Sequence, residues 1–494
     1  MVAERAADGT KGLKAGALGF VSNVVIGVAS TAPGYSLASS LGLVVAAVGL
    51  QSPAIMLLAF VPMLMIAASY YYMNRANADA GTTFTWVTMA MGPWLGWLGG
   101  WAIVVADIIV MANLSQIAGI YTFLLVGADS YAASTFWVTF VGVLWIVIMT
   151  VICYIGVELS AKTQWYLLAA EIVTLAAFAV VALWKVYVNS PPGSIDPSLS
   201  WINPFDIPST NALVAGILVA VFIYWGWDST VTVNEESNDP NHGPGLAAIV
   251  ATLVLVGIYV IVSVAAQAYA GPDFLINNSD DVLSALGGDV LGSPLDKLLI
   301  IAVLTSASAS TQTTILPTTR TVLSMAYHGA APRRFARIHP QHLTPSTATI
   351  WMGVLSVGWY VGLTVLSEDI LFDSIASLGL MIAFYYGLTG YACAIYYRHE
   401  LVKSAKNFVL IGIAPVAGGI MLTYVFVKSC IDLADPANSE SGNSWFGLGP
   451  PLVIGGFFLV LGLVLMVAWY AKAPDFFRRK PQVADPAVLS AREP

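Results

Sequence analysis

The feature that most limits the fold of this chain is a run of 60 residues without a charge, Ala15–Asn74. The run is rich in Val, Ala, Leu and Gly, and it is longer than two bilayer crossings of about 20 residues each. Of the 494 residues, 58% are hydrophobic and 10% are charged, against about 25% charged in an average soluble domain. The sequence therefore predicts an all-α polytopic membrane protein.

Composition also excludes several classes of protein. A formal net charge of −8 with only 20 Lys and Arg leaves no basic surface for nucleic acid. The three cysteines lie far apart, and all five histidines fall in predicted loops, so we expect no metal site and no cofactor. No short apolar segment with a small-residue cleavage site follows the N-terminus, so we expect no removable signal peptide.

Hydropathy predicts twelve membrane segments. If the N-terminus is cytoplasmic, 17 of the 20 Lys and Arg lie on the cytoplasmic side, and only Lys185, Lys297 and Lys428 lie outside. This asymmetry favours a plasma-membrane protein with both termini in the cytoplasm. The segments span residues 17–48, 53–74, 90–126, 133–155, 160–187, 208–236, 245–270, 296–325, 346–366, 370–397, 406–429 and 449–471.

Two of these segments are interrupted near the middle. The first contains Ser30-Thr31-Ala32-Pro33-Gly34, and the sixth contains Tyr224-Trp225-Gly226-Trp227-Asp228. Irregular backbone at membrane depth is tolerated where it lines a cavity or is buried in protein. Ala32 and Gly226 are 194 residues apart, and the two segments begin about 191 residues apart. The two breaks therefore lie at corresponding positions in two halves of the chain. This arrangement favours an inverted-repeat transporter with a midplane site. The alternative is a pair of Pro or Gly kinks without a ligand.

This pattern predicts five parts. A cytoplasmic tail, 1–16, precedes a first five-helix repeat, 17–187. A second, inverted five-helix repeat covers 208–397, helices 11 and 12 cover 406–471, and a cytoplasmic tail covers 472–494.

Three carboxylates fall inside membrane segments with no basic residue beside them: Asp107, Glu171 and Asp228. A charge at the bilayer centre costs about 2.5–3.5 kcal/mol even on insertion scales. Each acid is therefore protonated or is met by a mobile cation, such as H⁺, Na⁺ or a substrate ammonium. We interpret Asp228 as a ligand contact and Glu171 as the proton carrier. The alternative for each is a neutral acid bonded to hydroxyls or carbonyls.

The eighth segment carries a run of hydroxyl side chains that includes Ser308, Ser310 and Thr311. Their oxygens are candidate ligands for Na⁺ or partners for a carboxyl group. The alternative is ordinary packing and back-bonding between helices.

Four stretches resemble the amino acid–polyamine–organocation (APC) superfamily of permeases, in an order that covers nearly the whole chain. The resemblance implies a five-plus-five inverted repeat (the LeuT-type fold) with broken helices 1 and 6. The stretches are Asp79-Ala80-Gly81 with Gly92-Pro93 and Gly99-Gly100-Trp101; Gly156-Val157 with Ser160-Ala161-Lys162; Gly226-Trp227 with Glu235-Glu236 and Pro240; and Arg320 with Met325 through Pro332 and Phe335-Ala336-Arg337.

The resemblance also implies a substrate held between the two breaks, with its carboxylate on backbone N–H groups of helix 1 and its amine on carbonyls of helix 6. The chain departs from the family at two positions. Pro33 removes one backbone N–H donor at the break in helix 1, and Glu171 stands in helix 5 where relatives that couple to protons place a Lys. The implied substrate-binding residues, including those we interpret directly, are Ser30, Thr31, Ala32, Gly34, Asp107, Tyr224, Trp225, Gly226 and Asp228.

These observations predict a secondary active transporter that imports an amino acid, or a related amine or polyamine, by alternating access with protons as the coupling ion. Glu171, Ser308, Ser310 and Thr311 are the expected ion-coupling residues. The alternatives are an exchanger, a Na⁺-coupled symporter or an ion channel, the last disfavoured by the paired breaks. No nucleophile and base pair and no metal-ligand cluster stands in the membrane segments, so we expect no enzyme.

Overall fold

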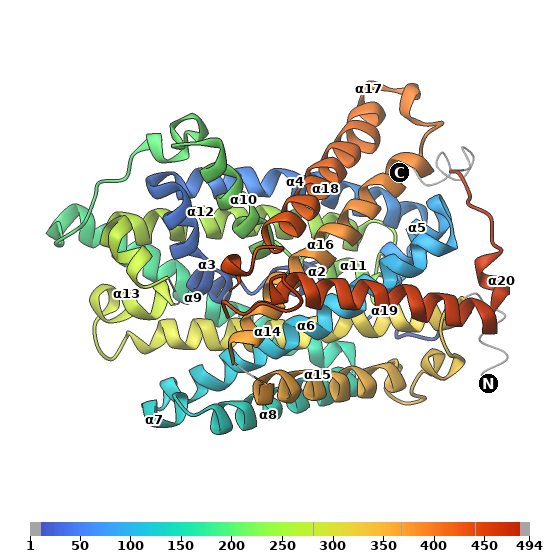
Figure 1. Ribbon diagram of the computed structural model, residues 1–494, viewed down its shortest axis with the longest axis horizontal. Coiled ribbons are helices and arrows are strands. Elements are labelled where there is room, and N and C mark those ends of the chain that lie inside the picture. The colour runs from blue at the N-terminus through green and yellow to red at the C-terminus, as the bar shows by residue number, and fades with distance from the viewer. Residues whose placement is uncertain (1–10, 280, 367, 440, 485–494) are drawn as a thin grey trace.

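The computed structural model describes residues 11–279, 281–366, 368–439 and 441–484, so the outer part of each predicted tail lies outside the described residues. Apart from two isolated β-bridges, the regular structure in this part of the chain is helical. Ten helical stretches among these residues are long and apolar enough to cross a membrane, and the first of them, Phe20–Ala76, contains 57 residues. Figure 1 shows long helices packed side by side along most of the molecule.

Most of the principal helices begin and end close to predicted segment ends, but most of the helix Thr83–Met91 and all of the helix Val282–Leu291 lie where no segment is predicted. They are α2 (Phe20–Ser30), α3 (Pro33–Val48), α4 (Ser52–Ala76), α5 (Thr83–Met91), α6 (Pro93–Leu125), α8 (Thr135–Ile155), α9 (Val157–Asn189), α10 (Thr210–Ile223), α11 (Ser229–Thr232), α12 (Gly243–Asn277), α13 (Val282–Leu291), α14 (Lys297–Tyr327), α15 (Ser346–Leu366), α16 (Glu368–Tyr396), α18 (Ala414–Asp432) and α19 (Pro450–Lys472).

The predicted seventh segment, 245–270, ends too early. Helix α12 continues to Asn277 through a kink at Gly271, which has φ 74° and ψ 167°. Pro follows Gly271 and starts a new helical turn, because its missing N–H is not needed at the first position of a helix. A Gly-Pro pair that indicates a helix end can therefore also mark a kink.

Helices α6 and α14 form the centre of the fold. In their most apolar stretches 72% of the residues of α6 and 78% of those of α14 are buried, against 28% in α8 and 22% in α19. These two helices pack against each other, and α8 lies against α15 along one edge of the molecule (Figure 1). The polar residues of α14 are thus held inside the protein, away from lipid.

The first helix is interrupted where Pro33 and its neighbours predict. Helix α2 ends at Ser30, Ala32 adopts the left-handed conformation with φ 48°, and α3 begins at Pro33. Helix α10 ends at Ile223, and after a turn with Gly226 at φ 115° the short helix α11 begins at Ser229.

The two interruptions touch each other. The Ser30 and Ser229 hydroxyl oxygens are 2.8 Å apart. A Cβ atom on Gly226 would lie 2.7 Å from the Ser30 carbonyl oxygen, so only glycine fits this contact. Residues far apart in the sequence are thereby joined into one irregular region inside the helical bundle.

The residues just before α2 are held against the loop that follows α11. The Ala17 and Leu18 N–H groups donate to the Glu236 carbonyl oxygen at 2.8 and 3.0 Å, and Asn238 donates to Leu18 at 2.9 Å. Residues 11–18 therefore pack as part of the fold.

Candidate functional site

The backbone donors at the start of α3 are all occupied. The Thr31 and Ala32 N–H groups donate back to α2 at 3.2 Å each, and Pro33 has no N–H. The Gly34 N–H donates to Glu171 Oε1 at 2.7 Å, and the Tyr35 N–H donates to Ser306 Oγ at 3.1 Å. The break in the first helix is thus closed by side chains from α9 and α14.

Glu171 reaches this position from the middle of α9, and its side chain is fully buried. Its second oxygen, Oε2, has no hydrogen-bond partner among the described residues. Gly34 makes the approach possible, because a Cβ atom there would lie 3.2 Å from Glu171 Oε1 and 3.4 Å from the Ala302 carbonyl oxygen. A carboxyl group with one free oxygen therefore lies at the amino end of a half-helix.

Asp228, at the other break, is surrounded by tyrosines. Tyr386 donates its hydroxyl to Asp228 Oδ1 at 2.8 Å, and Tyr385 donates to Oδ2 at 3.3 Å, both from α16. The indole N–H of Trp225 donates to the Tyr385 hydroxyl at 2.5 Å, and the Trp227 ring stacks on Tyr386 at 5.2 Å. The side chain of Tyr224 points elsewhere and donates to the Met56 carbonyl oxygen at 2.9 Å.

Asp107 is also buried, in the middle of α6. It accepts a hydrogen bond from Thr318 Oγ1 of α14 at 2.5 Å. Tyr385 lies within electrostatic range of both Asp107 and Asp228. The three elements α6, α11 and α16 therefore bring two acids and a tyrosine into one neighbourhood.

The hydroxyls of α14 behave in two ways. Ser308 and Thr311 donate to carbonyl oxygens one turn earlier, at 2.6 and 2.8 Å, as in ordinary helix back-bonding. Ser310 instead donates across to the Ser30 carbonyl oxygen at 2.8 Å and caps the end of α2. Thr31 also bonds back to its own helix, to Val28 at 2.7 Å.

A second polar cluster lies beside the hydroxyl-rich part of α14. Gln164 of α9 donates from its amide nitrogen to the Ala309 carbonyl oxygen at 2.9 Å and to Gln312 Oε1 at 2.6 Å, and Gln312 donates to Ser160. Sequence reasoning missed these amides because neutral side chains stand out little in a hydropathy profile.

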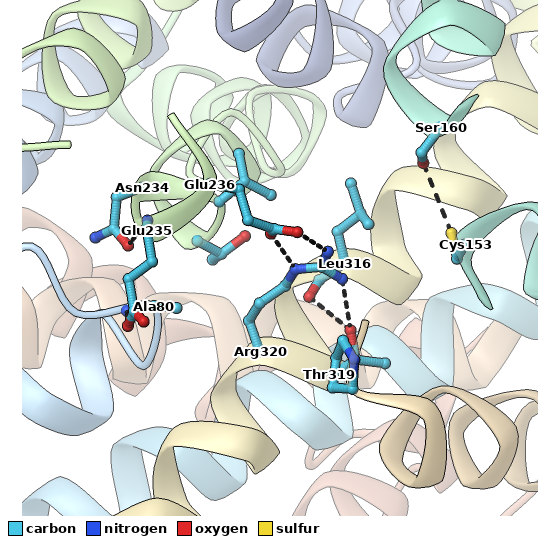
Figure 2. Close-up of polar contacts among 12 residues, drawn as sticks. Ala80, Cys153, Ser160, Asn234, Glu235, Glu236, Leu316, Thr319 and Arg320 are labelled. Atoms are coloured by element: carbon cyan, nitrogen blue, oxygen red, sulfur yellow. Dashed lines mark hydrogen bonds and ion pairs between the residues drawn. The ribbon is translucent and has the colours of Figure 1, made fainter. Parts of the chain in front are cut away.

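No ion pair reaches Asp107, Glu171 or Asp228 within the described residues. The one arginine buried in α14, Arg320, instead binds both carboxylate oxygens of Glu236 at 2.9 Å each, and both side chains are 0% exposed (Figure 2). No group of His, Cys, Asp and Glu in the described part of the chain is arranged to hold a metal ion.

Near this ion pair, Lys11 forms a buried cluster with acids from two loops. Its ammonium lies 2.8 Å from Asp79 Oδ1 and 2.5 Å from Glu235 Oε1. Burial alone would raise the pKa of Asp79, but Lys11 and His328 outweigh it and hold that pKa well below its ordinary value. Burial lowers the pKa of Lys11, yet the two carboxylates outweigh it and raise the pKa overall.

Comparison with known proteins identifies the chain at the level of its family. A model of the amino acid permease family matches residues 16–458. Cationic amino acid transporter 4 of Arabidopsis thaliana, described as vacuolar, is 24% identical over 343 residues, which are 64% of this chain and 53% of the plant protein.

Two bacterial proteins are also similar to this chain. An uncharacterized transporter of Mycobacterium tuberculosis is 28% identical over 305 residues, 59% of this chain and 63% of that protein. A branched-chain amino acid permease of Bacillus subtilis is 22% identical over 312 residues, again 59% and 63%. The chain thus covers less than two thirds of each of these relatives. Because the family model matches residues 16–458, well over half of the sequence, the chain belongs to the amino acid permease family, which confirms its resemblance to the APC superfamily.

Proposed function

We propose that this protein is a secondary active transporter that imports an amino acid, or a related amine, by alternating access. The observation that carries the proposal is the contact between the two helix interruptions, which have buried carboxyl groups beside them. These groups have hydroxyl and amide partners but no ion pair with any residue that the structure describes. Membership of the amino acid permease family supports the same function.

The proposed architecture is that of twelve membrane segments in a five-plus-five inverted repeat with two further helices, in the plasma membrane with both termini in the cytoplasm. The distribution of Lys and Arg supports this orientation. The short apolar helix α10 supplies the first half of the proposed sixth segment, and α11 continues it after the break.

We assign the substrate ammonium to Asp228. Its carboxyl group accepts from Tyr385 and Tyr386, which hold it in place and leave its charge without a cation. The carbonyl oxygens of Tyr224 and Trp225 accept no hydrogen bond from any described residue, so they are available to an N–H donor. An ammonium at this break would meet a charge and two backbone dipoles, as half-helix ends provide for ligands in transporters.

We assign ion coupling to Glu171, with H⁺ as the ion. A carboxyl that is fully buried and lacks a fixed cation is stable when it binds a proton or a mobile cation. Ser310, which joins α14 to the end of α2, is the hydroxyl best placed to respond to that change. Na⁺ coupling through the α14 hydroxyls is the alternative outcome of the test below.

The test is uptake of labelled amino acids and polyamines into proteoliposomes under imposed pH or Na⁺ gradients. We expect a pH gradient to drive uptake of at least one compound in wild-type protein, and Glu171→Gln to remove that response. Glu158→Gln is the matched control, since Glu158 lies in the same helix but is exposed and pairs with Lys14 at 2.7 Å. A response that Glu171→Gln leaves intact would refute the coupling role.

The contact role of Asp228 is tested by Asp228→Asn, with the exposed Asp206→Asn as control. We expect the first variant to weaken amine binding and the second to leave it unchanged. If Asp228→Asn binds amines as wild type does, the assignment is wrong. Uptake that requires internal substrate and ignores every gradient would identify an exchanger instead.

A further inference from the structure

The amino end of α3 already holds a carboxyl group, and that group belongs to the protein. Glu171 Oε1 accepts the Gly34 N–H at 2.7 Å, while Oε2 is buried without a partner in the described structure. The first N–H groups of a helix carry a partial positive charge and bind anions. Glu171 therefore occupies the position that an anionic part of a ligand would take at this break.

The arrangement leaves no place for a second carboxylate at the same donors. Pro33 offers no N–H, the Tyr35 N–H is bonded to Ser306, and the Ser36 N–H is bonded to Ala32. Only the Gly34 donor is held by a group that can change its charge. A ligand carboxylate that binds at this break therefore competes with Glu171 for the Gly34 donor.

We propose that Glu171 is a tethered competitor for the substrate carboxylate. In the empty protein Glu171 holds the Gly34 N–H. When Glu171 takes up one proton it becomes a neutral acid and a weaker partner for this donor, because charged hydrogen bonds are about twice as strong as neutral ones. The substrate carboxylate then accepts the Gly34 N–H, so one proton enters the protein for each carboxylate bound.

This inference rests on the proposed function, and it separates two classes of substrate. Amino acids bring a carboxylate that must displace Glu171. Amines made by removal of that carboxylate, such as putrescine from ornithine, contact Asp228 and leave Glu171 on Gly34. Binding of the first class is linked to a proton at Glu171, and binding of the second is not.

One experiment tests whether a free carboxylate can bind the Gly34 N–H, and it does not require that the substrate be known. Glu171→Ala removes the tethered carboxyl and frees the Gly34 N–H, so acetate should bind there and raise the melting temperature of the purified variant. Acetate should leave the melting temperature of wild type unchanged at a pH where Glu171 is ionised, because the charged carboxylate keeps the Gly34 N–H. Ethylamine, which would contact Asp228, should have the same effect on wild type and on Glu171→Ala. The proposal is overturned if acetate stabilises Glu171→Ala no more than wild type.

A second experiment uses matched ligand pairs and the shape-preserving variant Glu171→Gln, so it does not depend on the folding of Glu171→Ala. The pairs are L-lysine with cadaverine, L-ornithine with putrescine, and L-leucine with 3-methylbutylamine. In weak buffer with a pH indicator, at a pH high enough for Glu171 to be ionised in the empty protein, wild type should take up about one proton per amino acid bound, and none per amine. Glu171→Gln should bind the same amino acid without proton uptake.

Proton uptake that persists in Glu171→Gln, or that is equal for an amino acid and its amine, would overturn the inference while leaving transport itself in place. If no compound of the panel binds, the proposed function fails, and the acetate experiment still decides whether a free carboxylate can replace Glu171.

Discussion

The buried ion pair between Arg320 and Glu236 gives the sharpest stability prediction. The guanidinium donates from two nitrogens to the two carboxylate oxygens at 2.9 Å each, and a third nitrogen donates to Thr319 Oγ1 at 3.1 Å (Figure 2). Neither side chain has any exposed surface. Arg320→Met therefore leaves the Glu236 carboxylate buried without a cation.

Removal of one partner of a buried pair costs about 3–5 kcal/mol, whereas replacement of both partners by apolar residues is often neutral or stabilising. We expect Arg320→Met and Glu236→Leu each to lower the free energy of unfolding by about 3–5 kcal/mol. The double variant should recover most of that loss. The Glu236 carbonyl, which accepts from Ala17 and Leu18, is unaffected by either change.

Thermal unfolding of the four proteins in detergent, followed by fluorescence, measures the cycle. Cys153 adds a local readout: its thiol is 1% exposed and donates to the Gln312 carbonyl oxygen at 3.5 Å, so it should react with a thiol reagent only when this region opens. Arg478→Met is the matched control, since its side chain is 71% exposed. The reasoning is refuted if Arg320→Met melts as wild type does, or if the two single losses simply add in the double variant.

Three further predictions concern the site and the N-terminal segment. Gly34→Ala would place a Cβ atom 3.2 Å from Glu171 Oε1, and we expect this overpacking to cost about 1–3 kcal/mol in thermal unfolding and to reduce uptake. Tyr386→Phe removes the hydroxyl that donates to Asp228 at 2.8 Å. Loss of a hydrogen bond to a charged group costs about 1.5–3 kcal/mol. We therefore expect the pH dependence of amine binding to shift in this variant. Because the pKa of Asp79 is lowered and that of Lys11 is raised, their contribution to stability should be present at neutral pH. This contribution should be lost as pH falls through the folded pKa of Asp79 or rises through that of Lys11. Limited proteolysis of residues 11–18 should accelerate at those pH values, and it should also accelerate at neutral pH in Lys11→Met.

The helices of this chain were predictable because membrane solvation imposes a simple rule: long apolar stretches must satisfy their backbone internally. The interruption near Pro33 was predictable because Pro lacks an N–H, whereas the left-handed conformation falls on Ala32, a residue that the sequence does not mark for it. The kink at Gly271 shows the limit of this reasoning, because the same residue types end one helix and bend another.

The partners of the predicted acids were not predictable. Glu171 meets Gly34 across 137 residues, and Asp228 meets Tyr386 across 158. The sequence does not show which face of an apolar helix its tyrosines occupy. The contacts of Tyr385 and Tyr386 with Asp228 therefore depend on how α16 packs. The α14 hydroxyls show the same limit: the sequence leaves open whether Ser308 and Thr311 are ion ligands or bond to their own helix, and in the structure both donate to carbonyl oxygens one turn earlier.

The distribution of counter-ions within the fold supports the distinction between structural and functional acids. Glu236, Asp79 and Glu235 are held by fixed cations on the proposed cytoplasmic side. Arg320 of α14 pairs with Glu236, and Lys11 of the N-terminal segment pairs with Asp79 and Glu235 in two loops. Among the residues that the structure describes, Glu171 and Asp228, at the two breaks, are held only by N–H and O–H donors. A fixed arginine or lysine at the breaks would have to be displaced by every cationic ligand, at a cost of several kcal/mol. Neutral donors orient a carboxyl group and leave its charge available, which is what reversible binding of a proton or an ammonium requires.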